Sequence, residues 1–306
     1  MVQKKQLIKY IEIEGLRLEK LSYEIHDAAK NLQENHYIKT SELIISLVEK
    51  LEKQGNLERG VFGQEISSLF EVFKNEFATS CPIGQSYRRR CFEEVTKIVL
   101  KAFGHENDTK SSLSPEINRF MDRMHKVKES IGPMMDHFMN LHSKQDRSDQ
   151  ESSIMFHSAT QSYLITIEGV VDELAKTLYG LIKILHGDEP KFEDLQDANV
   201  WAILRECKHF FGIRPVFLEN WQEKSDVRNA IAHAQAQYSS KENKCHFWSI
   251  DRTSKRIYDR TMSFEEFLAI QLELIDAIDS FYYAIELFRV MQLLALLNAM
   301  RTSRDD

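Results

Sequence analysis

Three polar residues in the second half of the chain have the chemistry needed to cleave RNA without a metal ion. Arg228, Asn229 and His233 lie within the stretch Ser225–Gln237. A histidine titrates near neutral pH, so it can remove a proton from a ribose 2′-hydroxyl or return one to a leaving group. An arginine stays charged and binds phosphate oxygens through paired hydrogen bonds, so it can stabilise the charge of the transition state. The same residue types also occur on ordinary amphipathic helices, where they are solvated or make structural hydrogen bonds.

A helix of about three turns is predicted for this stretch. It contains four alanines, which have the highest helix propensity, and Ser225 or Asp226 could cap its N-terminus. Asn229 and His233 are four residues apart, so a helix makes their side chains neighbours, and the long side chain of Arg228 can reach the same patch. A separate apolar face is predicted to pack through Val227, Ile231, Ala234 and Tyr238.

The order Arg-Asn-x-x-x-His resembles the Arg-x(4–6)-His signature of HEPN domains (higher eukaryotes and prokaryotes nucleotide-binding), in which a polar residue, often Asn, follows the Arg. The matching residues lie in a helical frame that extends from Gln161 to Met300. The resemblance implies an up-and-down helical bundle that dimerises, with a metal-independent endoribonuclease site where two motif copies meet. It implies that Arg228 binds the phosphate, Asn229 is an orienting hydrogen-bond donor and His233 is the general acid or base.

The resemblance also implies a biological setting. RNA would be the substrate, cleaved in a stress, toxin or phage-defence (abortive infection) response and restrained by a regulatory protein or an antitoxin. HEPN toxins that a nucleotidyltransferase silences usually carry Tyr two residues after the His, whereas this chain has Gln235 there and its nearest tyrosine is Tyr238. This difference argues against that toxin–antitoxin branch. The competing hypothesis is a non-catalytic helical module that binds a protein partner.

Two further residues are predicted to support the motif. Glu168 lies at the edge of the apolar stripe of a long helix, where a charge normally needs a partner, so we expect an ion pair that orients the Arg228 guanidinium. A simply exposed Glu168 is the alternative. Tyr238, five residues after His233, is a candidate for a supporting hydrogen bond.

A basic β-hairpin is predicted after the motif, because two segments of aromatic and β-branched residues flank a polar turn between Cys245 and Arg260. Between Tyr238 and Met262, six basic residues outnumber three acidic ones, although the whole chain has a net charge of −7. We therefore expect a local RNA-binding surface, while a merely solvated hairpin fits the same pattern. The candidate RNA-binding residues are Lys241, Lys244, Arg252, Lys255, Arg256 and Arg260.

The length of 306 residues indicates two domains, and the small numbers of prolines (five) and glycines (eleven) favour helices. We expect an all-α protein with a boundary in the polar stretch 143–153, which has no apolar residue. Residues 1–150 would form a helical regulatory, sensor or partner-binding domain. Residues 151–306 would form a HEPN-like up-and-down bundle with a small β-hairpin after the motif helix.

Local signals give four expectations about individual helices. Ser41 is predicted to cap one helix, and Ser263 with Glu266 to form a capping box at the start of the last one. Gly132-Pro133 is predicted to kink or break a methionine-rich helix. The three arginines at 88–90 are expected to be solvated or paired with nearby glutamates, and contact with a nucleic-acid backbone is the alternative.

Other classes of function have no support in the sequence. The chain has no P-loop, GxGxxG, GxSxG or HExxH motif, which argues against nucleotide hydrolysis, dinucleotide chemistry and zinc proteolysis. The four cysteines are widely spaced, so we expect reduced thiols and no zinc site from Cys207, His209, Cys245 and His246. No cofactor or metal is expected. The most apolar run, Val290–Met300, is too short to span a bilayer, and we expect a soluble cytoplasmic homodimer.

Overall fold

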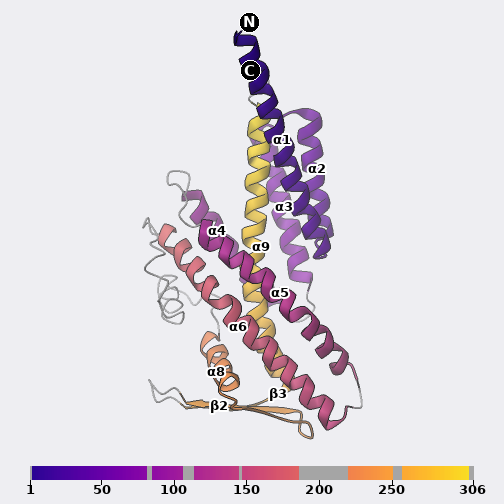
Figure 1. Cartoon of the computed structure of the whole chain (residues 1–306), viewed down its shortest axis with the longest axis vertical. Helices are drawn as coiled ribbons and strands as arrows, with labels where there is room; N and C mark the ends of the chain where they lie inside the picture. Colours follow the sequence, from indigo (N-terminus) through magenta and orange to yellow (C-terminus); the bar gives the residue numbers. More distant parts are fainter. Residues whose placement is uncertain are drawn as a thin grey trace. The chain divides into compact units, whose positions relative to one another are not determined.

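A computed structural model of the chain is mostly helical, as predicted, with a small antiparallel sheet near the motif (Figure 1). The structure describes residues 2–80, 85–105, 114–144, 147–185, 220–250 and 257–302. The helices in these ranges are α1 (Val2–Glu34), α2 (Ile38–Gln54), α3 (Arg59–Thr79), α4 (Gln85–His105), α5 (Ser114–His142), α6 (Asp149–Leu185), α8 (Trp221–Ala232) and α9 (Phe264–Thr302). The strands are β1 (Ala236–Ser239), β2 (Lys244–Ile250) and β3 (Ile257–Ser263).

The chain divides into two compact units whose limits differ from the predicted division at residue 150. Unit 1 consists of Met1–Arg89 and Tyr283–Asp306, and unit 2 of Arg90–Tyr282. Helix α6 begins inside the stretch that we predicted to be a linker. The reason is a capping box: the Ser148 N–H donates to Glu151 Oε2 (3.0 Å), and the Glu151 N–H donates to Ser148 Oγ (3.2 Å). The polar residues of this stretch therefore start a helix.

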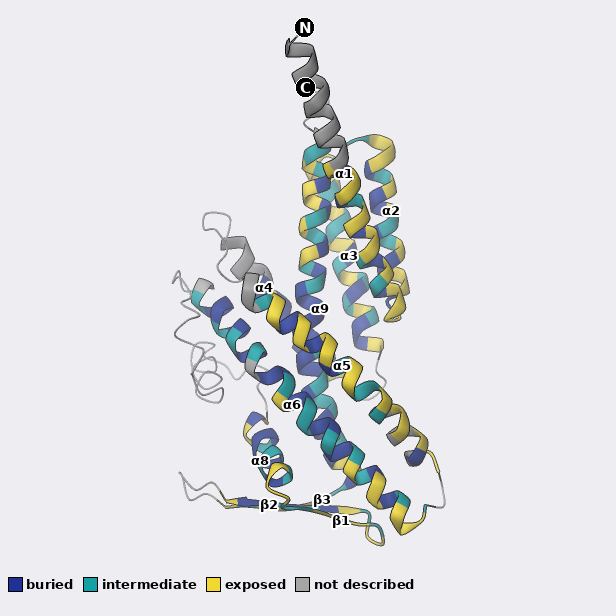
Figure 2. Ribbon diagram, in the orientation of Figure 1, coloured by how far each residue is buried: buried dark blue, intermediate teal, exposed yellow. Residues whose placement is uncertain are grey.

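Aromatic rings form the centre of unit 1. Tyr37 is almost fully buried, and its ring centroid lies 5.0 Å from that of Phe73 and 4.8 Å from that of Tyr283. Phe77 extends this cluster, and the buried Arg88 guanidinium lies 4.1 Å from the centroid of the Phe77 ring. The expectation that the three arginines at 88–90 are solvated is therefore wrong for Arg88, because this cation is buried and packs on an aromatic face. Figure 2 shows the buried stripes of α2 and α3.

The N-terminus of α2 is capped by a carboxylate from α3. Glu76 accepts hydrogen bonds from the backbone N–H groups of Lys39 and Thr40, both at 2.9 Å, and from Thr40 Oγ1 at 2.6 Å. The residue that precedes α2 contributes no side-chain cap. The prediction that Ser41 caps this helix is wrong, because the helix begins at Ile38 and Ser41 is buried within it. Glu76 thus satisfies N–H groups that the helix itself leaves without acceptors.

We predict that Glu76→Ala lowers the free energy of unfolding by about 1–2 kcal/mol, because the capped N–H groups lose a charged acceptor near the positive end of the helix dipole. Urea unfolding followed by circular dichroism measures the change. Glu71→Ala on the same helix is the matched control, because it removes a carboxylate whose side chain is 57% exposed and which pairs with Lys74 instead of capping a helix. A Glu76→Ala protein as stable as this control would contradict the capping role.

Unit 2 contains α5 and α6, which pack side by side along their lengths (Figure 1). A Cβ atom at Gly169 would lie only 2.6 Å from Val127 Cγ2, so glycine allows the close approach of these two helices. Helix α5 runs continuously through Pro133, and the predicted break at Gly132-Pro133 does not occur. We attribute this continuity to the packing of α5 on α6, which offsets the hydrogen bond that proline cannot donate.

The sheet has the order β1-β2-β3 with antiparallel pairing throughout. The predicted hairpin corresponds to β2 and β3, and β1 is a third strand that the sequence did not indicate. Cys245, Phe247 and Ser249 point to the buried side of β2, which faces α8. The capping box at the start of α9 is confirmed: the Ser263 N–H donates to Glu266 Oε2 (2.7 Å), and the Glu266 N–H donates to Ser263 Oγ (3.1 Å).

Helix α9 is, among the described helices, the one that is long and apolar enough to cross a membrane by length and composition. Its most apolar window has a mean hydropathy of 1.3, and 56% of that window is buried inside the protein. The core helix of a soluble protein has the same two properties, so length and composition alone give only weak evidence for a membrane span.

Candidate functional site

The motif helix α8 begins and ends earlier than predicted. It starts at Trp221, so Ser225 and Asp226 are buried within it and do not cap it. It ends at Ala232, and His233 is its C-cap residue. Val227 and Ala230 form its buried face, whereas Ile231 is half-buried, Ala234 is exposed and Tyr238 belongs to β1, so the predicted stripe is only partly right.

A Schellman motif ends α8 and turns the chain into β1. The Gln235 N–H donates to the Ala230 carbonyl (2.7 Å), and the Ala234 N–H donates to the Ile231 carbonyl (3.0 Å). Ala234 has φ = 56°, in the left-handed region where glycine is the usual residue. The turn leaves His233 exposed at the end of the helix.

Arg228 is held between two oxygen acceptors. Its Nη2 lies 2.7 Å from Glu168 Oε1 on α6, and its Nη1 donates to Asn229 Oδ1 at 2.9 Å. The predicted Glu168–Arg228 ion pair is thus confirmed. The side chains of Arg228 and Glu168 are 34% and 48% exposed, so the guanidinium is fixed but remains open to solvent. A guanidinium has five N–H donors, and those outside these two contacts can bind phosphate oxygens.

His233 is exposed to solvent at the C-terminal end of α8. Its backbone N–H donates to the Asn229 carbonyl (3.1 Å), which places His233 one helical turn beyond Asn229 as predicted. Among the residues that the structure describes, none makes a hydrogen bond or an ion pair with the imidazole. Asn229 accepts from Arg228 through its oxygen, so the donor role predicted for it would use its amide nitrogen.

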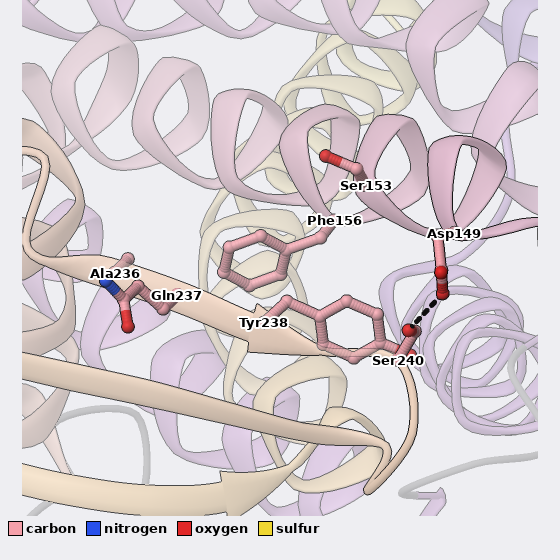
Figure 3. Close-up of a pocket in the computed structure, with 7 residues that line it drawn as sticks. All are labelled: Asp149, Ser153, Phe156, Ala236, Gln237, Tyr238 and Ser240. Atoms are coloured by element: carbon pink, nitrogen blue, oxygen red, sulfur yellow. Dashed lines mark hydrogen bonds between the residues drawn. The ribbon is translucent and has the colours of Figure 1, made fainter.

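The contacts of Tyr238 do not involve the Arg228 guanidinium. Its hydroxyl donates to Asn243 Oδ1 (3.0 Å), and its ring packs against Phe156 of α6 in an open pocket (Figure 3). Burial raises the pKa of this hydroxyl above its ordinary value, so it stays a neutral donor at physiological pH. The structure places no hydrogen bond between Tyr238 and Arg228, Asn229 or His233, so the supporting role that we predicted for it stays a prediction.

The basic residues predicted to bind RNA have different surroundings. Lys241 is exposed, and Lys244 makes a 3.7 Å ion pair with Glu242, in which both side chains are more than half exposed. Arg260 pairs with Glu223 on α8, which ties β3 to the motif helix. Arg252, Lys255 and Arg256 lie outside the described residues. The sequence therefore located a basic segment without showing that two of its cations, Lys244 and Arg260, are already paired with carboxylates.

A buried lysine beside the motif was not found from the sequence. Lys224 lies one helical turn before Arg228 and is completely buried. Its Nζ is 3.0 Å from Glu273 Oε2 on α9, and its carbonyl accepts a hydrogen bond from the Tyr163 hydroxyl (2.7 Å). Lysine is rarely buried without a partner, so we infer that this ion pair anchors α8 against α9.

The described residues contain no group of three or more His, Cys, Asp or Glu that could hold a metal ion. Cys245 is buried, which raises the pKa of its thiol to about 12, and His246 is paired with Asp259 at 2.8 Å. Cys207 and His209 lie outside the described residues.

Comparison with known proteins adds no family: no protein-family model, curated protein or solved structure matches the chain.

Proposed function

We propose that this protein is a metal-independent endoribonuclease of the HEPN type that acts as a homodimer. The observation that supports this proposal most directly is a partly exposed Arg228 that two acceptors hold in place, together with an exposed His233 one turn beyond Asn229. Fixing the guanidinium before the substrate arrives lowers the cost of reorganisation in the transition state. We place this activity in the cytoplasm, in a toxin or phage-defence response, with a regulatory element that restrains it.

In the proposed reaction, His233 removes the proton of the ribose 2′-hydroxyl, and the 2′-oxygen attacks the adjacent phosphorus. The bond between phosphorus and the 5′-oxygen breaks, so the products are a 2′,3′-cyclic phosphate and a 5′-hydroxyl. Arg228 binds the non-bridging oxygens, where charge develops. The leaving 5′-oxygen needs a proton, and in a composite site the His233 of a second chain supplies it.

Incubation of the purified protein with RNA in EDTA tests this proposal. We expect cleavage that resists the chelator and leaves 2′,3′-cyclic phosphate ends. Labelling of the fragment ends with T4 polynucleotide kinase, together with mass spectrometry, can identify these ends. Products with 3′-hydroxyl ends, or activity that needs added Mg²⁺, would contradict the mechanism. No cleavage of structured or unstructured RNA by a dimeric preparation would favour the non-catalytic interaction module.

The dimer requirement has its own test. If the site needs both motifs, subunit exchange of equal amounts of wild-type and His233→Ala chains should leave about one quarter of the wild-type activity, because only one dimer in about four has two intact motifs. If each chain acts alone, about one half remains. Size-exclusion chromatography with light scattering gives the oligomeric state under the same conditions.

Glu168 is proposed to act as a positioning residue for Arg228. We predict that Glu168→Gln lowers the single-turnover cleavage rate about tenfold to hundredfold, because the guanidinium loses its charged anchor and its geometry loosens. The free energy of unfolding should fall by less than about 1 kcal/mol, since both side chains of the pair are partly exposed and solvent screens their attraction. In the Arg228→Ala background the same substitution should have no further effect. An additive loss in the double variant would contradict a role through Arg228.

A further inference from the structure

An open pocket lies between the start of α6 and β1, the strand that follows the motif in the sequence. Its volume is about 430 Å³, within the range of pockets that hold small ligands or single residues of a polymer. Asp149, Ser153 and Phe156 line it from α6, at a spacing that puts them on one face of the helix. Strand β1 begins three residues after His233, so the pocket is only a few residues along the chain from the candidate site.

The apolar part of the pocket is an aromatic surface formed by two rings that stack on each other with an offset. The Phe156 and Tyr238 rings are inclined by only 17°, with centroids 5.5 Å apart. In Figure 3 they lie side by side between α6 and β1, each with a face turned toward the viewer. Phe156 also contacts the rings of Phe247 and Phe267 in the core of unit 2, so this surface has a rigid support. Two nearly parallel, half-exposed rings suit the stacking of a planar group.

The polar part of the pocket consists of hydrogen-bond acceptors and hydroxyls beside this surface. Asp149 Oδ1 accepts from the Ser240 hydroxyl at 2.6 Å, which fixes the carboxylate at the rim, and Asp149 is otherwise exposed (Figure 3). Ser153 adds an exposed hydroxyl above the Phe156 ring. An ionised carboxylate accepts hydrogen bonds and donates none, and it repels phosphate. The pocket therefore favours a planar ligand that has N–H donors on its edge.

We propose that this pocket binds a base of the RNA substrate, and that it prefers bases with an exocyclic amino group, above all cytosine over uracil. This inference rests on the proposed function, since it assigns the substrate specificity of that site. The base stacks on Phe156 and Tyr238, and its amino group donates to Asp149. Uracil has a carbonyl oxygen where cytosine has the amino group, so at this position the carboxylate meets an acceptor. The remaining donor of uracil, N3–H, lies one position further along the edge, so uracil can pair with the carboxylate only by shifting on the rings and is disfavoured.

The test measures binding of short fluorescein-labelled 2′-O-methyl oligocytidine and oligouridine to the full-length protein by fluorescence anisotropy. The 2′-O-methyl group removes the nucleophile, so binding is measured without cleavage. We expect oligocytidine to bind about tenfold more tightly than oligouridine. Asp149→Asn should reduce this preference to about twofold or less, because an amide offers a donor as well as an acceptor. Asp259→Asn, which removes one negative charge from the sheet instead, should leave the preference unchanged.

A second variant tests the pocket without altering the aromatic core. Ser153 is exposed on α6, so Ser153→Leu should fold normally and place a bulky side chain over the stacking surface. We expect it to weaken binding of both oligonucleotides about tenfold. Equal affinity for the two oligonucleotides in the wild type, no binding of either, or an unchanged preference in Asp149→Asn would overturn the inference.

The two proposals fail in distinguishable ways. A protein that prefers oligocytidine but does not cleave unmodified RNA supports the pocket and contradicts the ribonuclease. A protein that cleaves RNA in EDTA with no preference for cytosine supports the ribonuclease and overturns the pocket. Sequencing of the cleavage sites left by wild type and Asp149→Asn reports the same preference in the active enzyme.

Discussion

Arg228→Ala and His233→Ala are each expected to lower the rate of EDTA-resistant RNA cleavage at least about a thousandfold. Removal of Arg228 takes away the cation that would face the phosphate, an interaction of the size that oxyanion-stabilising donors supply. Removal of His233 takes away the only group of the motif that can transfer a proton near neutral pH. Single-turnover assays with a labelled RNA give the rates, and the cyclic phosphate ends should disappear with the activity.

Two matched controls separate loss of chemistry from loss of charge or fold. Arg123→Ala removes an exposed arginine of α5, and His246→Ala removes a histidine that is paired with Asp259, both in the same unit. Each should keep cleavage within about threefold of wild type, because neither group is a member of the motif. If Arg228→Ala and His233→Ala cleave as fast as these controls, the activity belongs to another site or another protein.

Much of the candidate site followed from local rules in the sequence. The i, i+4 spacing put His233 one turn from Asn229, and the position of Glu168 beside an apolar stripe required a partner for its charge. Both expectations agree with the structure. The spacing of Asn229 and His233 follows from helix geometry, and the Glu168–Arg228 ion pair follows from the free-energy cost of a charge near apolar residues. The role of these residues in cleavage stays a prediction.

Prediction from the sequence failed where a polar or small residue is compatible with two different local conformations. The residues around Ser148 have the composition of a linker, but the same serine and glutamate make a capping box that starts α6. The alanines after His233 predict a longer helix, yet Ala234 takes a left-handed conformation that normally signals glycine. Strand β1 has four residues, too few for its alternation to stand out from the turn around it. In each case the tertiary structure decided between two locally acceptable conformations.

The pocket and the buried lysine depend on contacts between segments far apart in the sequence. Phe156 and Tyr238 are separated by more than eighty positions, and no pattern around either one indicates that their rings meet. Lys224 has an ordinary place in a helix with charged neighbours, where a lysine is usually exposed. Its burial follows from Tyr163 on α6 and Glu273 on α9, which close around α8. Rules based on the spacing of residues along the chain do not predict long-range packing of this kind.

Loss of the partner of Lys224 is expected to be the most destabilising single change that we predict. Glu273→Gln should lower the free energy of unfolding by about 3 kcal/mol, because it leaves the fully buried ammonium without the carboxylate that lies 3.0 Å from it. Urea unfolding followed by tryptophan fluorescence measures the loss. Glu242→Gln is the matched control: its ion pair with Lys244 is exposed, so the expected change is below about 0.5 kcal/mol.

The double variant Lys224→Met/Glu273→Gln identifies the cause of this loss. Methionine fills a similar volume without a charge, so the double variant should regain most of the stability that Glu273→Gln loses. A double variant no more stable than Glu273→Gln would show that packing, and not the lost attraction between Lys224 and the Glu273 carboxylate, is responsible. Because Lys224 precedes Arg228 by one turn of α8, the same pair also anchors the helix that carries the motif. We therefore expect Glu273→Gln to slow RNA cleavage, and the double variant to recover the rate together with the stability.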